Sequence, residues 1–456
     1  MTSPANTRLP ISDDVEAVLP AAISRGHDWL KSTADEEDKA TEQLADLLRD
    51  EDGVKFTMDF VDRVMRPEDD KVAAHALKDI SSHYDPSFLG SINGALVGAG
   101  GFFGPILPNL VMPVARLYMR KMVGHLVLDA ESDALNKILD KAAESGEQLN
   151  LNLLGEAVLG EEEAKSRAQR TLKLIQNPRV TYVSVKASSM VAQLNHWDID
   201  GSVERLKERL RPLYQAAADR TDKVFINMDM EEYHDLHLTI RLFKELLSEP
   251  EFLTLDAGIV LQAYLPDTFD ALKDVADFAK ERVAKGGGKV KVRIVKGANL
   301  SMETVQGEVH DWPLATYTNK LDVDANYYRL LDFILREEYA DSVRIGVATH
   351  NLYTAAMAYE LGKKRGVLHM MDSEMLQGMS PAQQAAVRKV FEGRQILYTP
   401  VVHADDFDVA VSYLVRRLEE NSAPQNFLYA LFAPGEEPLA DQEETFRRAV
   451  AKRWDT

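Results

Sequence analysis

The sequence contains no cysteine. This absence excludes disulfide bonds, metal sites with thiolate ligands and a catalytic cysteine. Positive charge is also scarce, because 53 Lys and Arg residues stand against 73 Asp and Glu residues and give a formal net charge of −20 at pH 7. A surface that binds nucleic acid needs clustered Lys and Arg side chains, so we expect no nucleic-acid partner.

Signals for export or membrane insertion are also missing. Residues 1–10 have neither the basic nor the apolar part of a signal peptide, which predicts a cytoplasmic location. The uncharged stretch from Pro86 to Ala115 exceeds the roughly 20 residues of a membrane-spanning helix. Glycines and prolines interrupt it throughout, however, and these residues break helices. We therefore expect a buried connector, with a membrane-contacting segment as the alternative.

Several common catalytic motifs are absent. The sequence has neither the His-Glu-x-x-His motif of metalloproteases nor the Gly-x-Ser-x-Gly motif of serine hydrolases. The segment Gly98–Gly104 approaches a dinucleotide-binding loop, but its third glycine is one position late and no strand precedes it. His350, His369 and His403 also lack the spacing of metal ligands, so no metal site is predicted.

The chain divides into three parts by its apolar periodicity. Residues 1–115 predict a helical N-terminal arm followed by the uncharged connector, with helical spacing in Val15, Val18, Leu19 and Ile23. Residues 116–440 begin with a long helix over Arg116–Ala143 and then alternate between strands and helices. Residues 441–456 predict a C-terminal tail helix.

Eight apolar or β-branched runs, separated by amphipathic helices, follow one another in the second part. They are Leu149–Leu154, Val180–Val185, Lys223–Met228, Gly258–Ala263, Val290–Val295, Val343–Ala348, Val367–Met371 and Gln395–Val401. Such alternation predicts an α/β protein with a parallel (β/α)8 TIM-like barrel. A doubly wound open sheet is the alternative, but eight units favour a closed barrel.

Polar side chains recur where these runs end. They are Glu156, Lys186, Asp229, Gln262, Arg293, Lys296, His350, Asn351, Asp372, Glu374 and Tyr398. In barrel enzymes the catalytic groups lie at the C-terminal ends of the strands and in the loops that follow. Any one of these residues is more often structural, but their recurrence at every strand predicts an active site.

A second group lies on the last predicted barrel helix. Tyr413 precedes Arg416 and Arg417 by three and four positions, so the three side chains can share one helix face. Two adjacent guanidinium groups can bind a carboxylate through paired, charge-assisted hydrogen bonds. The alternative is an exposed basic helix end that pairs with Glu419 and Glu420.

Two lysines at strand ends indicate a different type of reaction as an alternative. Lys186 or Lys296 would form a Schiff base with a carbonyl substrate, as in barrel aldolases, if desolvation lowered its pKa. Arg293 and Lys296 are three positions apart, so a regular strand points them to opposite faces. This places Lys296 at the rim, where it suits a phosphate better than a carbonyl carbon. A binding module without turnover is a third reading.

Seven segments in barrel order resemble the signatures of proline dehydrogenases. They are Leu154–Ala157, Gln262–Tyr264, Val292–Ala298, Ala348–Asn351, Met375–Met379, Tyr398–Pro400 and Tyr413–Leu418. The sequence is most similar to the proline dehydrogenase portion of the bacterial bifunctional proline utilisation flavoenzymes. The resemblance extends from about Arg116 to Phe427. Asn299 departs from the pattern, because many members carry an aromatic residue there.

The resemblance implies a function, a cofactor and partners. Members of the family use noncovalent FAD to oxidise L-proline to Δ1-pyrroline-5-carboxylate, the first step of proline catabolism, by hydride transfer to flavin N5. A membrane quinone is the implied electron acceptor, which would bring the protein to the inner face of the cell membrane as a peripheral contact. Without a cysteine the chain cannot perform the second oxidation, so coupling to a separate pyrroline-5-carboxylate (aldehyde) dehydrogenase is implied.

The resemblance also implies roles for individual residues. Lys186, Arg416 and Arg417 would bind the proline carboxylate, and Asp229, Leu376, Tyr398 and Tyr413 would surround the ring. Glu156 would pair with Arg416 when the site is empty. The residues implied in FAD binding are Gln262, Arg293, Val295, Lys296, Gly297, Ala298, Thr318, Lys320, Thr349, His350, Asn351, Glu374, Glu420, Asn426 and Phe427.

Overall fold

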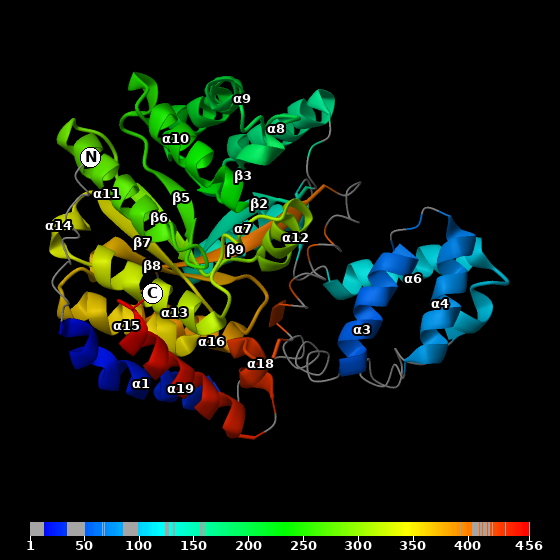
Figure 1. Ribbon diagram of the computed structural model, residues 1–456. Coiled ribbons are helices and arrows are strands. Elements are labelled where there is room, and N and C mark those ends of the chain that lie inside the picture. Colours follow the sequence, from blue (N-terminus) through cyan, green and yellow to red (C-terminus); the bar gives the residue numbers. More distant parts are fainter. Residues whose placement is uncertain are drawn as a thin grey trace.

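A closed parallel barrel forms the main body of the protein (Figure 1). The computed structural model describes residues 13–33, 51–65, 67, 69–84, 99–123, 127–130, 133–155, 158, 160–392, 394–403, 410, 413, 417, 420–421, 423–433 and 435–455. The barrel strands are β2 (Gln148–Leu153), β3 (Tyr182–Lys186), β4 (Phe225–Asp229), β5 (Ala257–Gln262), β6 (Val290–Val295), β7 (Val343–Ala348), β8 (Met371–Leu376) and β9 (Gln395–Val402). They pair in sequence order, and β9 closes the barrel by pairing with β2. The predicted fold class is confirmed.

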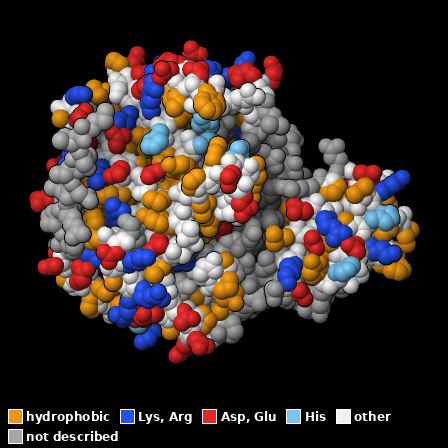
Figure 2. Space-filling model, viewed as in Figure 1, with side chains coloured by type: hydrophobic (Ala, Val, Ile, Leu, Met, Phe, Trp, Pro, Cys, Tyr) orange, Lys and Arg blue, Asp and Glu red, His pale blue; other side chains and the backbone are white. Residues whose placement is uncertain are grey.

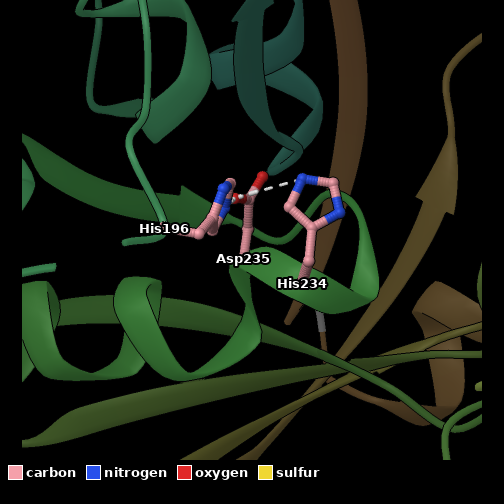
Figure 3. Close-up of side chains that lie close together, drawn as sticks. All are labelled: His196, His234 and Asp235. Atoms are coloured by element: carbon pink, nitrogen blue, oxygen red, sulfur yellow. Dashed lines mark hydrogen bonds and ion pairs between the residues drawn. The ribbon is translucent and has the colours of Figure 1, made fainter. Parts of the chain in front are cut away.

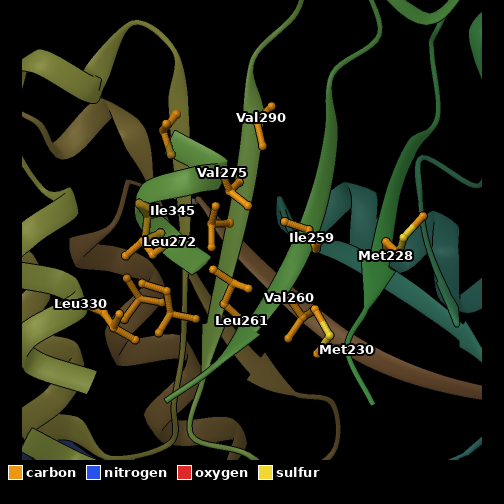
Figure 4. Close-up of a cluster of buried hydrophobic side chains, with 14 of the residues drawn as sticks. Met228, Met230, Ile259, Val260, Leu261, Leu272, Val275, Val290, Leu330 and Ile345 are labelled. Atoms are coloured by element: carbon orange, nitrogen blue, oxygen red, sulfur yellow. The ribbon is translucent and has the colours of Figure 1, made fainter. Parts of the chain in front are cut away.

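Helices surround the strands and bury their outward-facing side chains. They are α8 (Glu161–Gln176), α9 (Ile199–Asp219), α10 (Leu236–Leu247), α11 (Thr268–Ala284), α13 (Lys320–Ile334), α14 (Glu337–Ala340), α15 (Leu352–Lys364) and α16 (Pro381–Val390). The helix α12 (Leu300–His310) follows β6, and its apolar side chains are mostly exposed. Leu272 and Val275 of α11 and Leu330 of α13 belong to one apolar cluster with Val290 and Ile345 of the strands (Figure 4). This layer fixes the strand positions, and so it fixes the strand ends where the candidate site lies.

The interior of the barrel is partly charged. Lys291 of β6 is only 1% exposed, and its Nζ lies 5.3 Å from the centre of the Tyr182 ring on β3. Because β3 and β6 are not neighbours in the sheet, this side chain crosses the barrel interior. Side chains alternate along a strand, so Arg293 points inward as well.

Two expected elements differ from the structure. The strand predicted at Val367–Met371 is wrong in position, because β8 covers Met371–Leu376 and therefore contains Asp372 and Glu374. The single helix predicted over Arg116–Ala143 is also wrong. It is divided into α6 (Pro108–Val123) and α7 (Asp133–Ser145), with the short strand β1 (Leu128–Asp129) between them. Leu128 is buried and pairs with Val401 of β9, and this pairing competes with the helix.

Helices from the two ends of the chain lie side by side against the barrel (Figure 1). They are α1 (Asp14–Thr33) and α19 (Glu437–Lys452). Arg453, the residue after α19, links this helix to two others. Its guanidinium group bonds to Asp332 of α13 at 2.9 Å and to Glu16 of α1 at 2.7 Å. The apolar face of α1, including Val15 and Ile23, belongs to the barrel core. The short helix α18 (Phe427–Phe432) precedes α19.

A second helical unit lies beside the barrel (Figure 1). It consists of α3 (Glu51–Phe60), the π-helical turn Val61–Met65, α4 (Asp70–His83) and α6, which share an apolar core of their own. Apolar side chains are also visible on its surface (Figure 2). The exposed ones before and along α6 are Phe102, Phe103, Ile106, Leu107, Leu110, Val114 and Leu117. The expected burial of the connector is therefore confirmed only for one face of residues 99–115, where Met112 is buried in this core, and residues 86–98 lie outside the described part.

Among the described residues, no helix is long and apolar enough to cross a membrane. The predicted division of the chain at residues 115 and 440 stays a prediction.

Candidate active site

A cleft of ≈ 320 Å³ lies at the C-terminal ends of the barrel strands. It is lined by most of the residues that the sequence predicts for the site: Lys186, Asp229, Gln262, Arg293, Val295, Lys296, Gly297, Ala298, Lys320, Thr349, His350, Asn351, Glu374, Leu376, Tyr398, Arg417, Glu420, Asn426 and Phe427. The parallel strands all end on the same side, which brings together residues far apart in the sequence.

Arg293 is held deep in this cleft by partners on two other strands. Its Nε donates to Glu374 Oε2 at 2.5 Å, and its guanidinium carbon lies 4.8 Å from the centre of the Tyr398 ring. Burial lowers the pKa of Arg293, but the nearby carboxylates of Glu374 and Asp229 outweigh burial and raise its pKa overall. Arg293 is therefore a fixed positive charge.

Glu374 in turn is shared between two cations. Its second oxygen, Oε1, lies 2.6 Å from Lys291 Nζ, and the same Nζ lies 3.0 Å from Asp372 Oδ2. A buried charge is tolerated when it is paired in this way, and removing one partner leaves the other uncompensated. The network Lys291–Glu374–Arg293 therefore sets the position of the guanidinium group in the cleft.

Asp229 and Tyr398 form a second fixed pair. The Tyr398 hydroxyl donates to Asp229 Oδ2 at 3.0 Å, while Asn227 Nδ2 donates to Asp229 Oδ1 at 2.8 Å. Burial raises the pKa of Asp229, and the cations Arg293 and Lys186 oppose this shift only in part. The pair places a phenol ring between Asp229 and the guanidinium group of Arg293.

Two further cations line the cleft. Lys186, at the end of β3, lies 3.6 Å from Glu231, measured from Nζ to Oε1. Arg417 bonds to Glu420 through Nη1 at 2.7 Å, and its guanidinium carbon lies 5.0 Å from the centre of the Tyr413 ring. Burial lowers the pKa of Arg417, but Tyr413 and Glu420 raise it by a larger amount. The pKa therefore lies above its usual value, and the guanidinium group stays charged. These two cations could together hold a small anion.

Lys296 and Lys320 form a basic corner of the cleft around Asp324. Lys296 Nζ lies 2.5 Å from Asp324 Oδ1, and Lys320 pairs with the other oxygen of this carboxylate. Burial and the charge of Lys320 lower the pKa of Lys296 to about 8, against the opposing effect of Asp324. One carboxylate between two ammonium groups leaves a net positive charge, which suits a phosphate.

Gly297 allows the backbone to pass close to a ring. Its φ of +120° lies in a region that residues with a side chain rarely adopt, and an added Cβ would come within 2.5 Å of the Tyr264 ring. The chain therefore turns sharply after Lys296 and brings the backbone of residues 297–299 to the cleft wall.

His350 is a neutral hydrogen-bonding group. The backbone N–H of Leu376 donates to His350 Nε2 at 2.9 Å, and Nδ1 lies 3.2 Å from the Ser380 hydroxyl oxygen. Burial, followed by the charge of Arg417, lowers the pKa of His350 to about 4. The ring therefore carries its proton on Nδ1 and does not add charge to the cleft.

Asn351 and Asn426 use their side chains to begin helices. Asn351 Oδ1 accepts from the backbone N–H groups of Tyr353 and Thr354, which caps α15. Asn426 Oδ1 accepts from Leu428 N and caps α18. Both helix starts therefore face the cleft.

Four predicted residues are not part of the described cleft wall. Thr318 is exposed and does not line the cleft. The Tyr413 ring contacts the guanidinium group of Arg417 and packs on the apolar cluster that includes Leu154. Glu156 and Arg416 lie outside the described residues, so their predicted pairing stays a prediction.

Sequence reasoning missed two carboxylates that hold cleft cations. Asp324 lies on α13 and Glu231 lies in the loop after Asp229, and neither immediately ends an apolar run. Asp324 lies four positions after Lys320, and this helical spacing is the signal that would have found it.

The donor set of the cleft fits a flavin nucleotide. The buried Gln262 Oε1 faces the cleft and has no hydrogen-bond partner among the described residues. A buried polar atom without a partner is costly unless a ligand completes it. The basic corner of Lys296 and Lys320, the exposed backbone after Gly297 and the fixed charge of Arg293 supply the other contacts.

The sequence model of the family described as Proline dehydrogenase matches residues 134–430. This chain belongs to the proline dehydrogenase family. The predicted resemblance is therefore confirmed, and with it the prediction of a proline dehydrogenase-type enzyme. The match covers the barrel from α7 to α18 and includes every described residue of the cleft wall.

Solved structures of proline utilization A (PutA) proteins are similar to this proline dehydrogenase chain. PutA from Corynebacterium freiburgense is 61% identical over 74% of this chain and 33% of its own, with a TM-score of 0.68. PutA from Bdellovibrio bacteriovorus, inactivated by N-propargylglycine, is 26% identical over 94% of this chain and 44% of its own, with a TM-score of 0.76. A PutA mutant from Bradyrhizobium japonicum shares the fold at 21% identity and a TM-score of 0.67, covering 99% of this chain and 49% of its own.

The chain thus spans between about a third and a half of the length of these relatives. No curated protein matches it.

Proposed function

We propose that this chain oxidises L-proline to Δ1-pyrroline-5-carboxylate, the first step of proline catabolism, with noncovalently bound FAD. The observation that carries the proposal is the fixed guanidinium group of Arg293, which lies between Glu374 and Tyr398 in one cleft with Lys186 and Arg417. Membership of the proline dehydrogenase family supports the same reaction.

The substrate carboxylate would bind to Lys186 and Arg417. Each of these cations has one acidic partner, Glu231 and Glu420 respectively, and each retains N–H donors for a further anion. Arg416 would join them from the same helix, as the sequence predicts. The pair Asp229–Tyr398 and the side chain of Leu376 would form the wall around the ring. Fixing the substrate at both ends orients the C–H bond that breaks, an effect worth several kcal/mol in well-oriented reactions.

FAD supplies, when bound, the acceptor for the hydride that leaves C5 of proline. Gln262, whose Oε1 has no hydrogen-bond partner among the described residues, would accept from the imide N–H of the ring system, and Arg293 would supply a permanent positive charge to the ring system. Lys296, Lys320 and the backbone of residues 297–299 would hold the phosphates. His350 and Asn351 would contact the ribityl part, and Phe427 also lines the cleft.

The electrons would pass to a membrane quinone. The exposed apolar side chains before and along α6 offer a surface for peripheral contact with a bilayer on the cytoplasmic side. The Δ1-pyrroline-5-carboxylate product would pass to a pyrroline-5-carboxylate (aldehyde) dehydrogenase, which would carry out the second oxidation.

One observation favours a Schiff-base lyase as a second candidate. The pKa of Lys296 is lowered to about 8, as a nucleophilic lysine requires. Its ammonium group, however, lies 2.5 Å from Asp324 Oδ1 and is therefore held as an ion-pair partner. Borohydride together with an aldehyde substrate would inactivate a lyase and leave a flavoenzyme intact.

Turnover tests the proposed reaction. The purified chain, supplied with FAD, is expected to reduce an artificial electron acceptor when L-proline is added, and N-propargylglycine is expected to inactivate it progressively. D-Proline serves as the matched control, because in the mirror-image molecule the carboxylate, the ring nitrogen and the C5–H bond that breaks cannot all take the same positions at once. Reduction that is equal with both enantiomers, or absent with L-proline, would contradict the proposal.

A further inference from the structure

Two histidines and an aspartate meet at the rim of the barrel, beside the cleft but outside its wall (Figure 3). His196 lies in the turn before α9, in the loop that follows β3. His234 and Asp235 lie at the start of α10, in the loop that follows β4. We propose that these three side chains bind one divalent transition-metal ion of the zinc type. The proposal does not depend on the reaction of the cleft.

The ligand atoms already converge. His196 Nε2 lies 2.6 Å from Asp235 Oδ1, and His234 Nε2 lies 3.6 Å from the same oxygen. All the candidate ligand atoms lie within 4.8 Å of one another. Ligands at zinc bond lengths in a tetrahedron are separated by about 3.3 Å. An ion would therefore require only small rotations of the two exposed rings.

His234 faces Asp235 without a hydrogen bond to it. Its Nε2 is too far from Asp235 Oδ1 for a hydrogen bond, yet the ring lies perpendicular to His196, with ring centres 4.4 Å apart. A cation shared by the two rings would use both nitrogens.

The side chain of Asp235 points toward the histidines and does not cap its helix. It occupies the N-cap of α10, where an aspartate normally accepts a backbone N–H, but its side chain makes no such bond. Its carboxylate is buried, with 8% of the side chain exposed, and points at the two imidazoles. A buried carboxylate that is directed away from its helix is suited to bind a cation.

The second nitrogen of His234 has the partner that metal-binding histidines commonly have. His234 Nδ1 lies 3.3 Å from Glu232 Oε2. A carboxylate in this position fixes the tautomer and raises the basicity of the nitrogen that faces the metal. On the other loop, Asn195 holds the turn, since its Oδ1 accepts the backbone N–H of Trp197 at 3.0 Å.

The chemical types of the three ligands favour a zinc-type ion. Two imidazoles and one carboxylate form the set that binds Zn²⁺ with a fourth position open to water, whereas Mg²⁺ and Ca²⁺ prefer oxygen ligands alone. The two loops follow the strands that end in Lys186 and Asp229, so the ion would tie together the loops on one side of the cleft. The ligands are separated by 38 and 39 residues in the sequence, which is why their spacing gave no indication of a metal site.

Direct metal binding tests the site. The full chain, freed of metal with a chelator, is titrated with Zn²⁺ against a chromophoric chelator, and with Co²⁺ to record the visible absorption of tetrahedral coordination. We expect one Zn²⁺ per chain, a tetrahedral Co²⁺ spectrum, and at least about 10-fold weaker binding in both His196→Ala and His234→Ala. Both side chains are more than a third exposed, so the substitutions spare the core.

His237→Ala is the matched control, because His237 is exposed one position beyond the first residue of the same helix. Its Zn²⁺ affinity is expected to equal that of the unchanged protein. Equal affinity in all four proteins, weaker binding in only one of the two ligand variants, or no binding at millimolar Zn²⁺ would overturn the three-ligand site.

Discussion

At the scale of single residues, the cleft is organised by paired charges. Arg293, Arg417 and Lys296 each have a carboxylate partner that holds the cation in place and keeps it charged. A paired cation retains donors for a ligand, so it can bind an anion without first being reoriented. The consequences can be tested by replacing one group at a time.

Replacing Arg417 removes one of the two described cations of the proposed carboxylate site. A charge-assisted hydrogen-bonded contact contributes about 1.5–3 kcal/mol, so Arg417→Met is expected to raise the KM for L-proline by about 10–100-fold. Steady-state kinetics measure the effect. Arg447→Met is the control, since Arg447 is an exposed arginine on α19 that pairs with Glu443. An unchanged KM in Arg417→Met would remove this residue from the carboxylate site.

Gly297→Ala tests the close approach of the backbone at the proposed phosphate site. The new Cβ would meet the Tyr264 ring at 2.5 Å, and its φ of +120° adds strain of about 1–3 kcal/mol. We expect a lower melting temperature and less FAD retained per chain. Gly286→Ala also has a positive φ, +80°, but nothing within 4 Å of its Cβ, so it should keep its FAD. Equal FAD content in the two variants would refute the role of Gly297.

His350 makes stability depend on pH. Its pKa of about 4 in the folded protein lies below the usual 6.5, so the unfolded chain takes up a proton before the folded one does as pH falls. The stability from the neutral ring is therefore present above pH 6.5 and is lost as pH falls toward 4. Between pH 7 and pH 5 this loss is roughly 2 kcal/mol.

Urea unfolding at the two pH values measures this dependence. We expect His350→Gln to lose less stability between pH 7 and pH 5 than the unchanged protein does. His310→Gln, in an exposed position on α12, is expected to keep the full dependence. The same loss in His350→Gln as in the unchanged protein would contradict the assignment.

At the scale of elements, the sequence predicted most of the barrel. The limits of β6 and β7 agree with their predicted runs, because Val and Ile are frequent in both strands even though charged side chains such as Lys291 and Arg293 lie between them. The strand β8 was misplaced. It contains Asp372 and Glu374, whose burial depends on Lys291 of another strand, and such long-range pairing leaves no local signal.

The sequence also predicted part of the candidate site. Residues that end strands, such as Lys186 and Asp229, lie in the cleft because strand ends must meet on one side of a barrel. The supporting residues Lys291, Asp324 and Glu231 were not predicted, because each acts through a partner that only the fold brings near. The packing of α1 on the barrel was also beyond the sequence pattern, which shows that a helix has an apolar face but not what covers it.

The exposed apolar face of α6 leads to a prediction about membrane contact. The net charge of −20 disfavours anionic lipid, so attraction to a bilayer would rest on apolar burial. We expect the protein to sediment with zwitterionic vesicles and the double variant Leu110→Ser and Leu117→Ser to sediment at least about 10-fold less. The matched control is Val309→Ser with Trp312→Ser, which removes exposed apolar groups at another place. An equal reduction in both double variants would contradict a specific contact through α6.

At the scale of the whole molecule, three structural parts have separate tasks. The barrel provides the cleft, α1 and α19 pack on the barrel, and the unit of α3, α4 and α6 presents an apolar surface. The cleft and the proposed metal site lie on the same side of the barrel, although they share no side chain. Metal binding and substrate binding can therefore be measured independently in the same protein.

The central claim is that bound flavin receives electrons from L-proline, and the visible spectrum under anaerobic conditions tests it most directly. The purified protein is expected to be yellow, and L-proline is expected to bleach its flavin absorbance, whereas D-proline should leave the spectrum unchanged. If the protein binds flavin and L-proline leaves that flavin oxidised without oxygen present, the account is contradicted.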